Sequence, residues 1–242
     1  MKKFGLIGKS LGHSFSKSFF DHKFDSEGID ASYTNFELPS LLDFKELALR
    51  CDGLNVTIPY KQEVISYLDE VSNEATAIGA VNTVLNDNGR LIGYNTDAFG
   101  FHQSIKPFLT NKHERAMILG TGGASKAVSF VLQKIGVDII YISRTPNSEN
   151  QFGYDEVNEN MIDACKLIVN CTPVGTFPNE HEFVSIPFKR LGSDHLVVDL
   201  IYNPEKTKFL ELSEQCGATI LNGESMLKQQ ALKSFEIWSQ KN

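Results

Sequence analysis

Apolar and polar positions along the chain repeat with two different periods, which predict where strands and helices occur. Short, mainly apolar runs typical of strands occur at residues 2–7, 32–37, 53–58, 116–119, 137–142, 166–171, 195–201 and 218–221. Helical spacing or capping signals occur at residues 17–26, 39–50, 72–79, 98–109 and 124–135, before residue 215, and from 224 to the C-terminus. From residue 116 onward strands alternate with helices, which predicts an α/β fold with an open parallel sheet.

A glycine-rich turn follows the strand at residues 116–119. Gly120, Gly122 and Gly123 stand directly before a helix that begins near Ala124. Glycines here let a pyrophosphate approach the backbone, and the helix points free N–H groups and the positive end of its dipole at that anion. A plain structural turn is the alternative, but the position between strand and helix favours dinucleotide binding.

The end of the next strand indicates which dinucleotide binds. An NAD site usually has Asp or Glu about 20 residues past the first glycine, where the carboxylate takes the ribose 2′-hydroxyl. This chain has Ser143, Arg144 and Thr145 at that place and no carboxylate. A guanidinium and two hydroxyls suit a 2′-phosphate, so the sequence predicts NADP. The alternative for Arg144 is a solvated surface charge.

Length and charge narrow the class of protein. A chain of 242 residues exceeds one comfortable core and favours two domains. Its net charge of −7 argues against nucleic acid or an acidic membrane as the main partner. No apolar run approaches the roughly 20 residues of a membrane span, and the N-terminus breaks at glycines too early for a signal sequence. We therefore expect a cytoplasmic protein. Its four cysteines lack paired metal spacing, so no metal is expected.

Two stretches in the first 61 residues carry candidate polar groups. Ser14 and Ser16 are two apart, so in extended backbone their hydroxyls project to one side and could grip a carboxylate; helix capping is the alternative. Asn55 and Thr57 share one face of a strand. The sequence predicts that Lys61 lies in the first turn of a helix, where its positive charge is unfavourable beside the helix dipole. Placement against local preference is typical of a functional residue. A solvated surface lysine is the alternative.

A hairpin is predicted around Asn88-Gly89, a pair typical of a type I′ turn. A two-residue turn pairs Asp87 with Arg90 and, counting back, Asn82 with Asn95. Asn82 and Asp97 should therefore lie at the same end of the hairpin. Asp97 also precedes a helical segment, where capping is the alternative role.

Polar residues at the ends of the later strands complete the set. Asn170 and Thr172 follow one buried strand and Tyr202 follows the next. Ligands of open parallel sheets bind outside the carboxyl ends of the strands. Each of these residues could equally be an ordinary loop residue.

Taken in order, these stretches resemble the shikimate dehydrogenases. The matching motifs run nearly end to end: HSFS, NVTIPYK, GAVNTV, GYNTD, LGTGGAS, SRT, NCTPVG, DLIYNP, NGESML and QQA. The resemblance implies an NADPH-dependent enzyme that reduces 3-dehydroshikimate to shikimate in the route to aromatic amino acids. It also implies a two-domain α/β protein. An N-terminal substrate-binding domain, residues 1–100 completed by a C-terminal helix at 224–242, would face a Rossmann-type NADP-binding domain, residues 101–223, across a cleft.

The resemblance also implies roles for individual residues. Lys61 and Asp97 would be the catalytic pair, with Lys61 the general acid and Asp97 holding it in place. The substrate carboxylate would bind Ser14 and Ser16. The remaining substrate-binding residues would be Asn55, Thr57, Asn82, Tyr202 and Gln230. The cofactor-binding residues would be Gly120, Gly122, Gly123, Ala124, Ser143, Arg144, Thr145, Thr172, Val174 and Gly223.

The chain departs from the family pattern at several positions. Ser10 and Lys17 replace prolines, Ala98 replaces a glycine and Thr176 a methionine, while Phe20-Asp21 stands where His-Asn is usual. The segment after SRT also lacks a second basic residue. These departures bear on the substrate loop, NADP affinity and nicotinamide packing.

Three other functions fit parts of the same sequence. One is a dehydrogenase of broader range that takes quinate or a related hydroxylated cyclohexane acid. Another is a non-catalytic NADP sensor or scaffold, against which the presence of Lys61 and Asp97 argues. The third is a bifolate-type dehydrogenase, disfavoured by Ser14 and Ser16. The expected partners are a small-molecule substrate and NADP, with no nucleic acid or membrane, in a monomer or homodimer.

Overall fold

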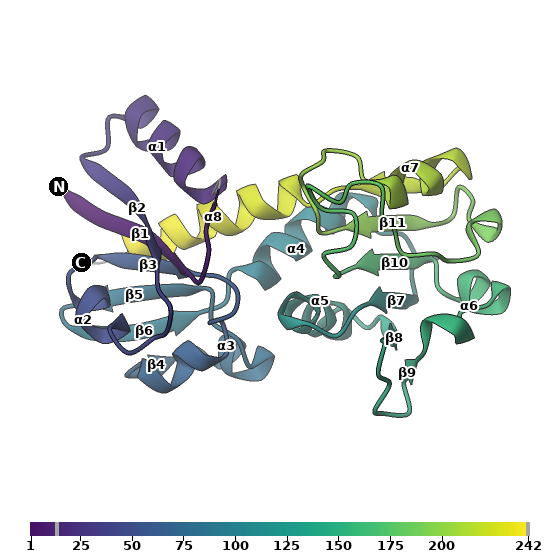
Figure 1. Cartoon of the computed structure of the whole chain (residues 1–242), viewed down its shortest axis with the longest axis horizontal. Helices are drawn as coiled ribbons and strands as arrows, with labels where there is room; N and C mark the ends of the chain where they lie inside the picture. Colours follow the sequence, from purple (N-terminus) through teal and green to yellow (C-terminus); the bar gives the residue numbers. More distant parts are fainter. Residues whose placement is uncertain (13–14, 241–242) are drawn as a thin grey trace. The chain divides into compact units, whose positions relative to one another are not determined.

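The structure is a computed structural model that describes residues 1–12 and 15–240, and it divides into two compact units (Figure 1). Unit 1 comprises residues up to Phe99 and the C-terminal residues from Gln230, and unit 2 comprises Gly100–Gln229. Helices α4 (Asp97–Ile105) and α8 (Glu224–Ser239) contribute to both. Each unit has its own six-stranded sheet. The predicted α/β class is confirmed.

Unit 1 is built on a mixed sheet of order β2-β1-β3-β5-β6-β4. β1, β2 and β3 are parallel, β5 is antiparallel to both β3 and β6, and β4 is parallel to β6. The strands are β1 Lys2–Gly8, β2 Ala31–Glu37, β3 Gly53–Val56, β4 Glu70–Val71, β5 Thr83–Asp87 and β6 Arg90–Tyr94, and the helices are α1 Phe15–Glu27, α2 Phe44–Leu49, the 3-10 helix η1 Glu63–Tyr67 and α3 Asn73–Ile78.

Each face of this sheet has its own apolar core because alternate strand residues point to opposite faces. Phe4 and Leu6 of β1 belong to a cluster with α1 and α8 residues, whereas Ile7 belongs to a cluster with α2 and η1 residues. On the first face, Trp238 of α8 stacks on Phe4 with ring centroids 4.7 Å apart. Its indole N–H donates to the Val84 carbonyl at 3.0 Å. Figure 1 shows α8 (yellow) alongside these strands.

Two predicted elements of unit 1 are shorter than expected. The helix predicted at 39–50 is present only as α2, because Leu41 is fully buried in a turn whose carbonyl accepts from the Phe44 N–H at 3.0 Å. The strand predicted at 53–58 ends at Val56. Ile58, the last residue of the predicted strand, lies in the following turn and is 76% exposed. Tertiary burial overrides local propensity in the first of these segments.

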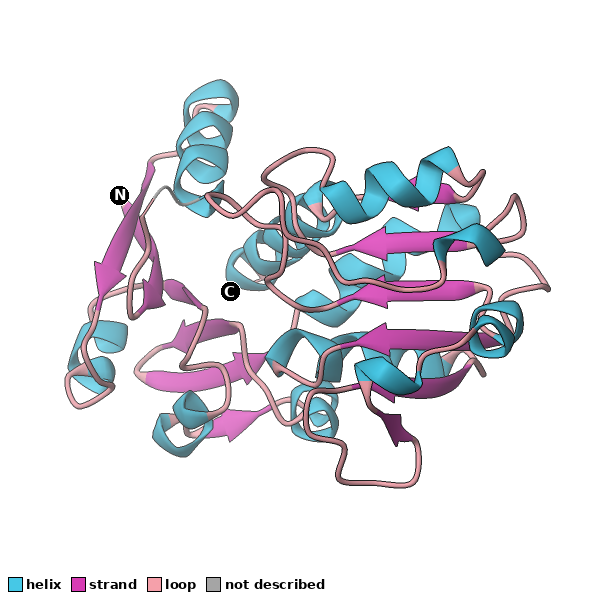
Figure 2. Ribbon diagram, turned by 45° about the vertical axis from the view of Figure 1, so that its right-hand side comes forward, coloured by secondary structure: helices cyan, strands magenta, loops and turns pink. Residues whose placement is uncertain are grey.

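Unit 2 is built on a fully parallel sheet of order β12-β11-β10-β7-β8-β9. Figure 2 shows these strands running in one direction with helices on both faces. The strands are β7 Arg115–Leu119, β8 Asp138–Ile142, β9 Gln151–Phe152, β10 Leu167–Asn170, β11 Leu196–Asp199 and β12 Thr219–Leu221, and the helices are α5 Gly123–Lys134, α6 Glu159–Ala164, α7 Lys208–Gln215 and the 3-10 helices η2 Lys106–Phe108, η3 Tyr154–Glu156 and η4 Phe188–Arg190.

The strand order of unit 2 is that of the Rossmann fold. Numbered along the chain within the unit, it reads 6-5-4-1-2-3, and the direction of winding reverses between β7 and β10. Ligands of such sheets bind at the carboxyl ends beside this reversal. The predicted open parallel sheet is confirmed.

A buried carboxylate holds the carboxyl ends of β10 and β11 together. Asp199 accepts hydrogen bonds from the Asn170 amide at 3.0 Å, the Thr207 hydroxyl at 2.7 Å and the Ile201 N–H at 3.1 Å. The side-chain oxygen Oδ1 of Asn170 in turn accepts from the hydroxyl and the N–H of Thr172. Thr172 is thus fixed at the reversal point through two fully buried side chains.

We expect Trp238→Ala to lower the unfolding free energy of unit 1 by about 3–5 kcal/mol, because it removes a buried ring and its hydrogen bond. Leu232→Ala is the control, since Leu232 lies on the same helix and is 41% exposed; it should cost less than about 1 kcal/mol. Urea denaturation measures both. Equal losses would contradict the role given to Trp238.

Asp199 predicts a specific pH dependence. Burial raises its pKa to about 6, well above the unfolded value. Its stabilising contribution is therefore complete below about pH 4 and is lost as the pH rises to about 6, by roughly 3 kcal/mol in all. Asp199→Asn should have a lower unfolding free energy than the wild type at pH 4. The difference between the two should shrink by roughly 3 kcal/mol by pH 7. Urea denaturation across this range tests it, with exposed Glu149→Gln as control; parallel profiles for wild type and Asp199→Asn would refute the assignment.

Candidate active site

The β5–β6 hairpin brings Asn82 and Asp97 to one end of the sheet. Asn88 and Gly89 have φ values of 53° and 93°, as a type I′ turn requires, and Asp87 pairs with Arg90. The predicted turn and register are confirmed. At the open end of the hairpin, the Thr96 N–H donates to the side-chain oxygen Oδ1 of Asn82 at 2.7 Å. Asp97 is the next residue.

Asp97 forms an ion pair with Lys61. The Lys61 Nζ lies 2.8 Å from Asp97 Oδ2, and 20% and 11% of the two side-chain surfaces are exposed. Asp97 does not cap α4, because the Asn95 side chain accepts from the Ala98 N–H at 3.1 Å instead. The carboxylate of Asp97 can therefore face Lys61 from the first turn of α4, where the helix dipole favours its negative charge.

Lys61 does not lie in a helix, contrary to the prediction from the sequence. It lies in the turn after β3, and the next helix, η1, begins at Glu63. The expected conflict with a helix dipole is therefore absent. Its backbone is held by the Val81 N–H, which donates to the Lys61 carbonyl at 2.7 Å. The prediction that Lys61 follows a polar strand end is therefore correct, but the argument from an unfavourable helix dipole is wrong.

Next to this pair lies a buried cluster of amides and hydroxyls. The Asn55 amide nitrogen donates to the Asn82 carbonyl at 3.2 Å, to Thr83 Oγ1 at 3.2 Å and to Ser234 Oγ at 3.0 Å. Asn82 in turn reaches Thr96 Oγ1 at 3.0 Å and the Gln230 side-chain oxygen at 3.4 Å. These side chains are buried and come from β3, β5, the end of β6 and α8.

Tyr33 of β2 connects this cluster to α1. Its hydroxyl donates to Asn55 Oδ1 at 2.8 Å and bonds to the Ser16 side chain. Burial raises the pKa of Tyr33, and the bond to Ser16 partly offsets that effect. The phenol therefore stays protonated and can donate. Since its one proton goes to Asn55, Ser16 donates to Tyr33 in this arrangement.

The other proposed substrate-binding residues lie as follows. Ser14 is outside the described residues. Thr57 is half-buried after β3, and its N–H donates to the Ile7 carbonyl. Tyr202 lies in unit 2 after β11 with 39% of its surface exposed.

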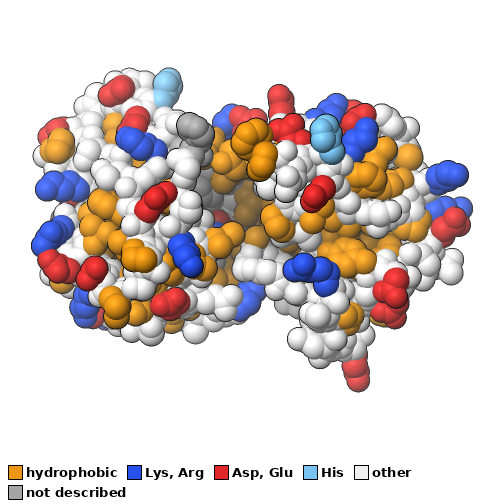
Figure 3. All heavy atoms as spheres, viewed as in Figure 1, with side chains coloured by type: hydrophobic (Ala, Val, Ile, Leu, Met, Phe, Trp, Pro, Cys, Tyr) orange, Lys and Arg blue, Asp and Glu red, His pale blue; other side chains and the backbone are white. Residues whose placement is uncertain are grey.

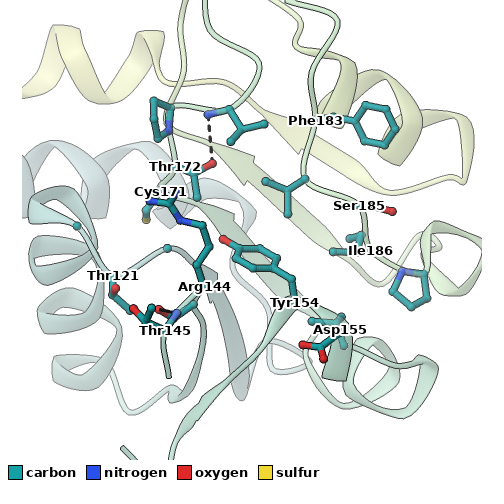
Figure 4. A pocket seen from close by; sticks show the side chains of 18 residues that line it. Thr121, Arg144, Thr145, Tyr154, Asp155, Cys171, Thr172, Phe183, Ser185 and Ile186 are labelled. Carbon is teal, nitrogen blue, oxygen red and sulfur yellow. Dashed lines mark hydrogen bonds between the residues drawn. The ribbon is translucent and has the colours of Figure 1, made fainter. Parts of the chain in front are cut away.

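Unit 2 has a cavity of about 1070 Å³ at the carboxyl ends of its strands (Figure 4). The glycine turn after β7 forms one wall. Gly120 has a φ of 94°, and a Cβ there would lie 2.8 Å from Thr172 Cγ2. Gly122 is the N-cap of α5, and as a glycine it has no side chain with which to cap the helix. The first N–H groups of α5 therefore remain available to an anion.

Further predicted residues line the same cavity: Ser143, Arg144, Thr145, Thr172 and Val174. The Ser143 oxygen accepts from the Thr145 N–H at 3.2 Å, while Arg144 is exposed and points into the space in Figure 4. Gly123 and Ala124 are the first residues of α5. Gly223 is buried against Leu200, where a Cβ would lie 2.1 Å from the carbonyl oxygen.

Sequence reasoning did not anticipate part of this cavity. Thr121 and Cys171 line it and fall inside motifs already noticed, but Tyr154, Asp155, Val157 and the segment 183–187 carry no sequence signal. A cavity of this size with a basic side chain, hydroxyls and a glycine turn can hold a phosphorylated nucleoside. Within residues 1–12 and 15–240, no three His, Cys, Asp or Glu side chains gather as metal ligands would.

The molecular surface carries both charges. On the face in Figure 3, Lys and Arg side chains are interspersed with Asp and Glu over both units. In the described part of the chain, no helix is both long enough and apolar enough to cross a membrane.

Comparison with known proteins gives a consistent result. Residues 6–84 match the family model of the shikimate dehydrogenase substrate binding domain. The shikimate dehydrogenase (NADP(+)) of Carboxydothermus hydrogenoformans is 38% identical, over 97% of this chain and 90% of the relative. The crystal structure of a chorismate mutase/shikimate 5-dehydrogenase fusion protein from Clostridium acetobutylicum aligns with a TM-score of 0.89 at 37% identity, covering 100% of this chain and 92% of that one.

A further crystal structure carries both ligands. Shikimate 5-dehydrogenase from Thermus thermophilus, in complex with NADP(H) and shikimate, aligns with a TM-score of 0.87 at 32% identity, over 99% of this chain and 94% of that one. The resemblance drawn from the motifs is therefore confirmed. The chain belongs to the shikimate dehydrogenase family.

Proposed function

We propose that this chain reversibly reduces 3-dehydroshikimate to shikimate with NADPH, and that unit 1 binds the substrate while unit 2 binds the cofactor. The observation that carries the proposal is the ion pair of Lys61 and Asp97 at 2.8 Å, beside a buried cluster of amides that can recognise hydroxyl groups. The names of the relatives support shikimate rather than quinate as substrate, and an enzyme rather than a sensor.

The substrate roles follow from chemistry. Ser14 and Ser16 hold the carboxylate, because hydroxyl hydrogens can point at its oxygens. Asn55, Thr57, Asn82 and Gln230 bind ring hydroxyls or orient the groups that do. Tyr202 helps to close the substrate pocket. To donate to the carboxylate, Ser16 turns its hydroxyl hydrogen away from Tyr33, which keeps its own bond to Asn55.

The catalytic roles belong to Lys61 and Asp97. As the substrate carbonyl is reduced, negative charge develops on its oxygen. The Lys61 ammonium stabilises that charge and donates the proton, while the Asp97 carboxylate keeps the ammonium aimed and charged. In the reverse direction Lys61 takes the proton back from the shikimate hydroxyl.

Unit 2 fits the phosphates of NADP. The uncapped first turn of α5 and the turn at Gly120, Gly122, Gly123 and Ala124 suit the pyrophosphate. Arg144, Ser143 and Thr145 offer a guanidinium and two hydroxyls to the 2′-phosphate. Thr172, Val174 and Gly223 line the nicotinamide end. When bound, the cofactor supplies the hydride, and the protein supplies orientation.

The proposal includes a cytoplasmic location, since substrate and cofactor are small metabolites, and a monomer or homodimer, since each proposed set of ligand-binding residues lies within one chain.

Lys61→Ala should lower kcat by roughly 100-fold to 10000-fold, because charge on the substrate oxygen develops only in the transition state. Asp97→Asn should also lower kcat, and the double variant should lose much less than the product of the two effects, because the pair acts as a unit. Steady-state kinetics measures this. Lys45→Ala is the control, since Lys45 is an exposed lysine of the same unit. Near-normal turnover of Lys61→Ala would remove the pair from the mechanism.

Arg144→Asp should lower the preference for NADP over NAD by roughly 10-fold or more, since it removes a charge-assisted contact of about 1.5–3 kcal/mol and adds repulsion. The ratio of kcat/KM values for the two cofactors measures the preference. Arg115→Asp, at the start of β7, is the control and should leave the ratio unchanged. An unaltered ratio in Arg144→Asp would refute the assignment.

A further inference from the structure

The cavity of unit 2 has two chemically different ends. One end has the glycine turn and the hydroxyls after β8, which suit phosphate and ribose. On the side away from Thr121, Figure 4 shows the Tyr154 ring and Ile186 together with Asp155 and Ser185, and Val157, Val184 and Pro187 also line the cavity. Arg144 points into the space between them in Figure 4. A ligand that placed a phosphate at Arg144 would therefore extend a neighbouring group toward apolar walls.

Tyr154 is fixed where it meets this space. It opens η3, directly after Gly153, whose N–H donates to the Glu156 carboxylate at 2.5 Å. Gly153 is buried against the same turn, where a Cβ would lie 2.4 Å from Asp155 Oδ1. The ring is half-buried, and Figure 4 shows it reaching into the cavity beside Arg144.

The electrostatic environment agrees with this placement. Burial raises the pKa of the Tyr154 phenol, and the nearby positive charge of Arg144 partly offsets the increase. The ring is thus neutral at physiological pH. A neutral aromatic face beside a guanidinium offers a planar base a stacking surface and leaves the charge available for phosphate.

We propose that Tyr154 forms the stacking face of a purine subsite, against which the adenine of the cofactor lies while its 2′-phosphate meets Arg144. This inference rests on the proposed binding of NADP by unit 2. Val157, Val184 and Ile186 add apolar lining, and the Asp155 carboxylate lies beside Tyr154. Tyr154 lies outside every motif that carries the family resemblance.

Stacking on Tyr154 would also compensate for a basic residue that the phosphate-binding segment lacks. The segment after Ser143-Arg144-Thr145 lacks a second basic residue, which would otherwise strengthen the hold on the 2′-phosphate. Stacking on Tyr154 supplies affinity from the base instead. Aromatic contacts of this kind typically change nucleotide binding by roughly 5-fold to 100-fold when the ring is removed.

The test is calorimetric titration of the whole chain with adenosine 2′,5′-bisphosphate and with AMP, which differ by the 2′-phosphate. We expect Tyr154→Leu and Tyr154→Ala to weaken both ligands by roughly 5-fold to 100-fold and to leave the ratio of the two affinities unchanged. Tyr154→Phe, which keeps the ring, should stay within about 3-fold of the wild type. Arg144→Ala should lower the affinity for the bisphosphate relative to the affinity for AMP. Phe108→Ala, an exposed aromatic beside a separate cavity of unit 2, is the control.

Each outcome is decisive. Unchanged affinities in a folded Tyr154→Leu, verified by its thermal melt, would overturn the stacking role. So would a loss confined to the bisphosphate, which would show that Tyr154 acts only through Arg144, or an equal loss in Tyr154→Phe. If the wild type bound neither ligand, the proposed NADP binding itself would fail, and no variant would be needed to show it.

Discussion

Buried polar groups must be hydrogen-bonded, and this requirement arranges the polar site of unit 1. Asn55 is 4% exposed, and its amide nitrogen can reach the Asn82 carbonyl only if Oδ1 turns toward Tyr33. The orientation of the amide is therefore determined by its neighbours. Asn82 is fixed in the same way, since only its oxygen can accept from the Thr96 N–H. Both side chains thus present a defined pattern of donors and acceptors without a ligand.

Local sequence signals predicted much of the framework. The hairpin at Asn88-Gly89, the helix predicted at 72–79 and the glycine turn after β7 all depend on residues within a few positions of one another. Errors arose where a distant contact decided the outcome. Burial of Leu41 shortened α2. Capping was only the alternative role for Asp97, and the Asn95 side chain caps α4 instead, although both residues are plausible caps by type. Local preference cannot decide which of the two residues caps the helix. The ion pair of Asp97 with Lys61 decides it, because it holds the Asp97 carboxylate.

The residues that orient the proposed substrate-binding amides were missed for a related reason. Tyr33, Thr83, Thr96 and Ser234 reach them from separate segments, and Ser234 is 179 positions from Asn55. One signal was available: Ser234 stands four residues after Gln230, so both occupy one face of α8. Nothing in the sequence, however, indicates which strand that face meets. Tyr154 was missed for another reason. It follows β9, which is only two residues long and therefore shows no apolar–polar alternation in the sequence.

The two partners of the Lys61–Asp97 pair are held by one short segment. The Val81 N–H donates to the Lys61 carbonyl at 2.7 Å, and the Asn82 oxygen accepts from Thr96, the residue before Asp97, at 2.7 Å. The adjacent residues Val81 and Asn82 therefore anchor the backbone at or next to Lys61 and Asp97. A group aimed in advance at developing charge needs no reorganisation during the reaction, which makes its electrostatic contribution large. Because Asn82 also belongs to the amide cluster, the groups proposed to recognise the ring hydroxyls and those proposed to move the proton share one rigid support.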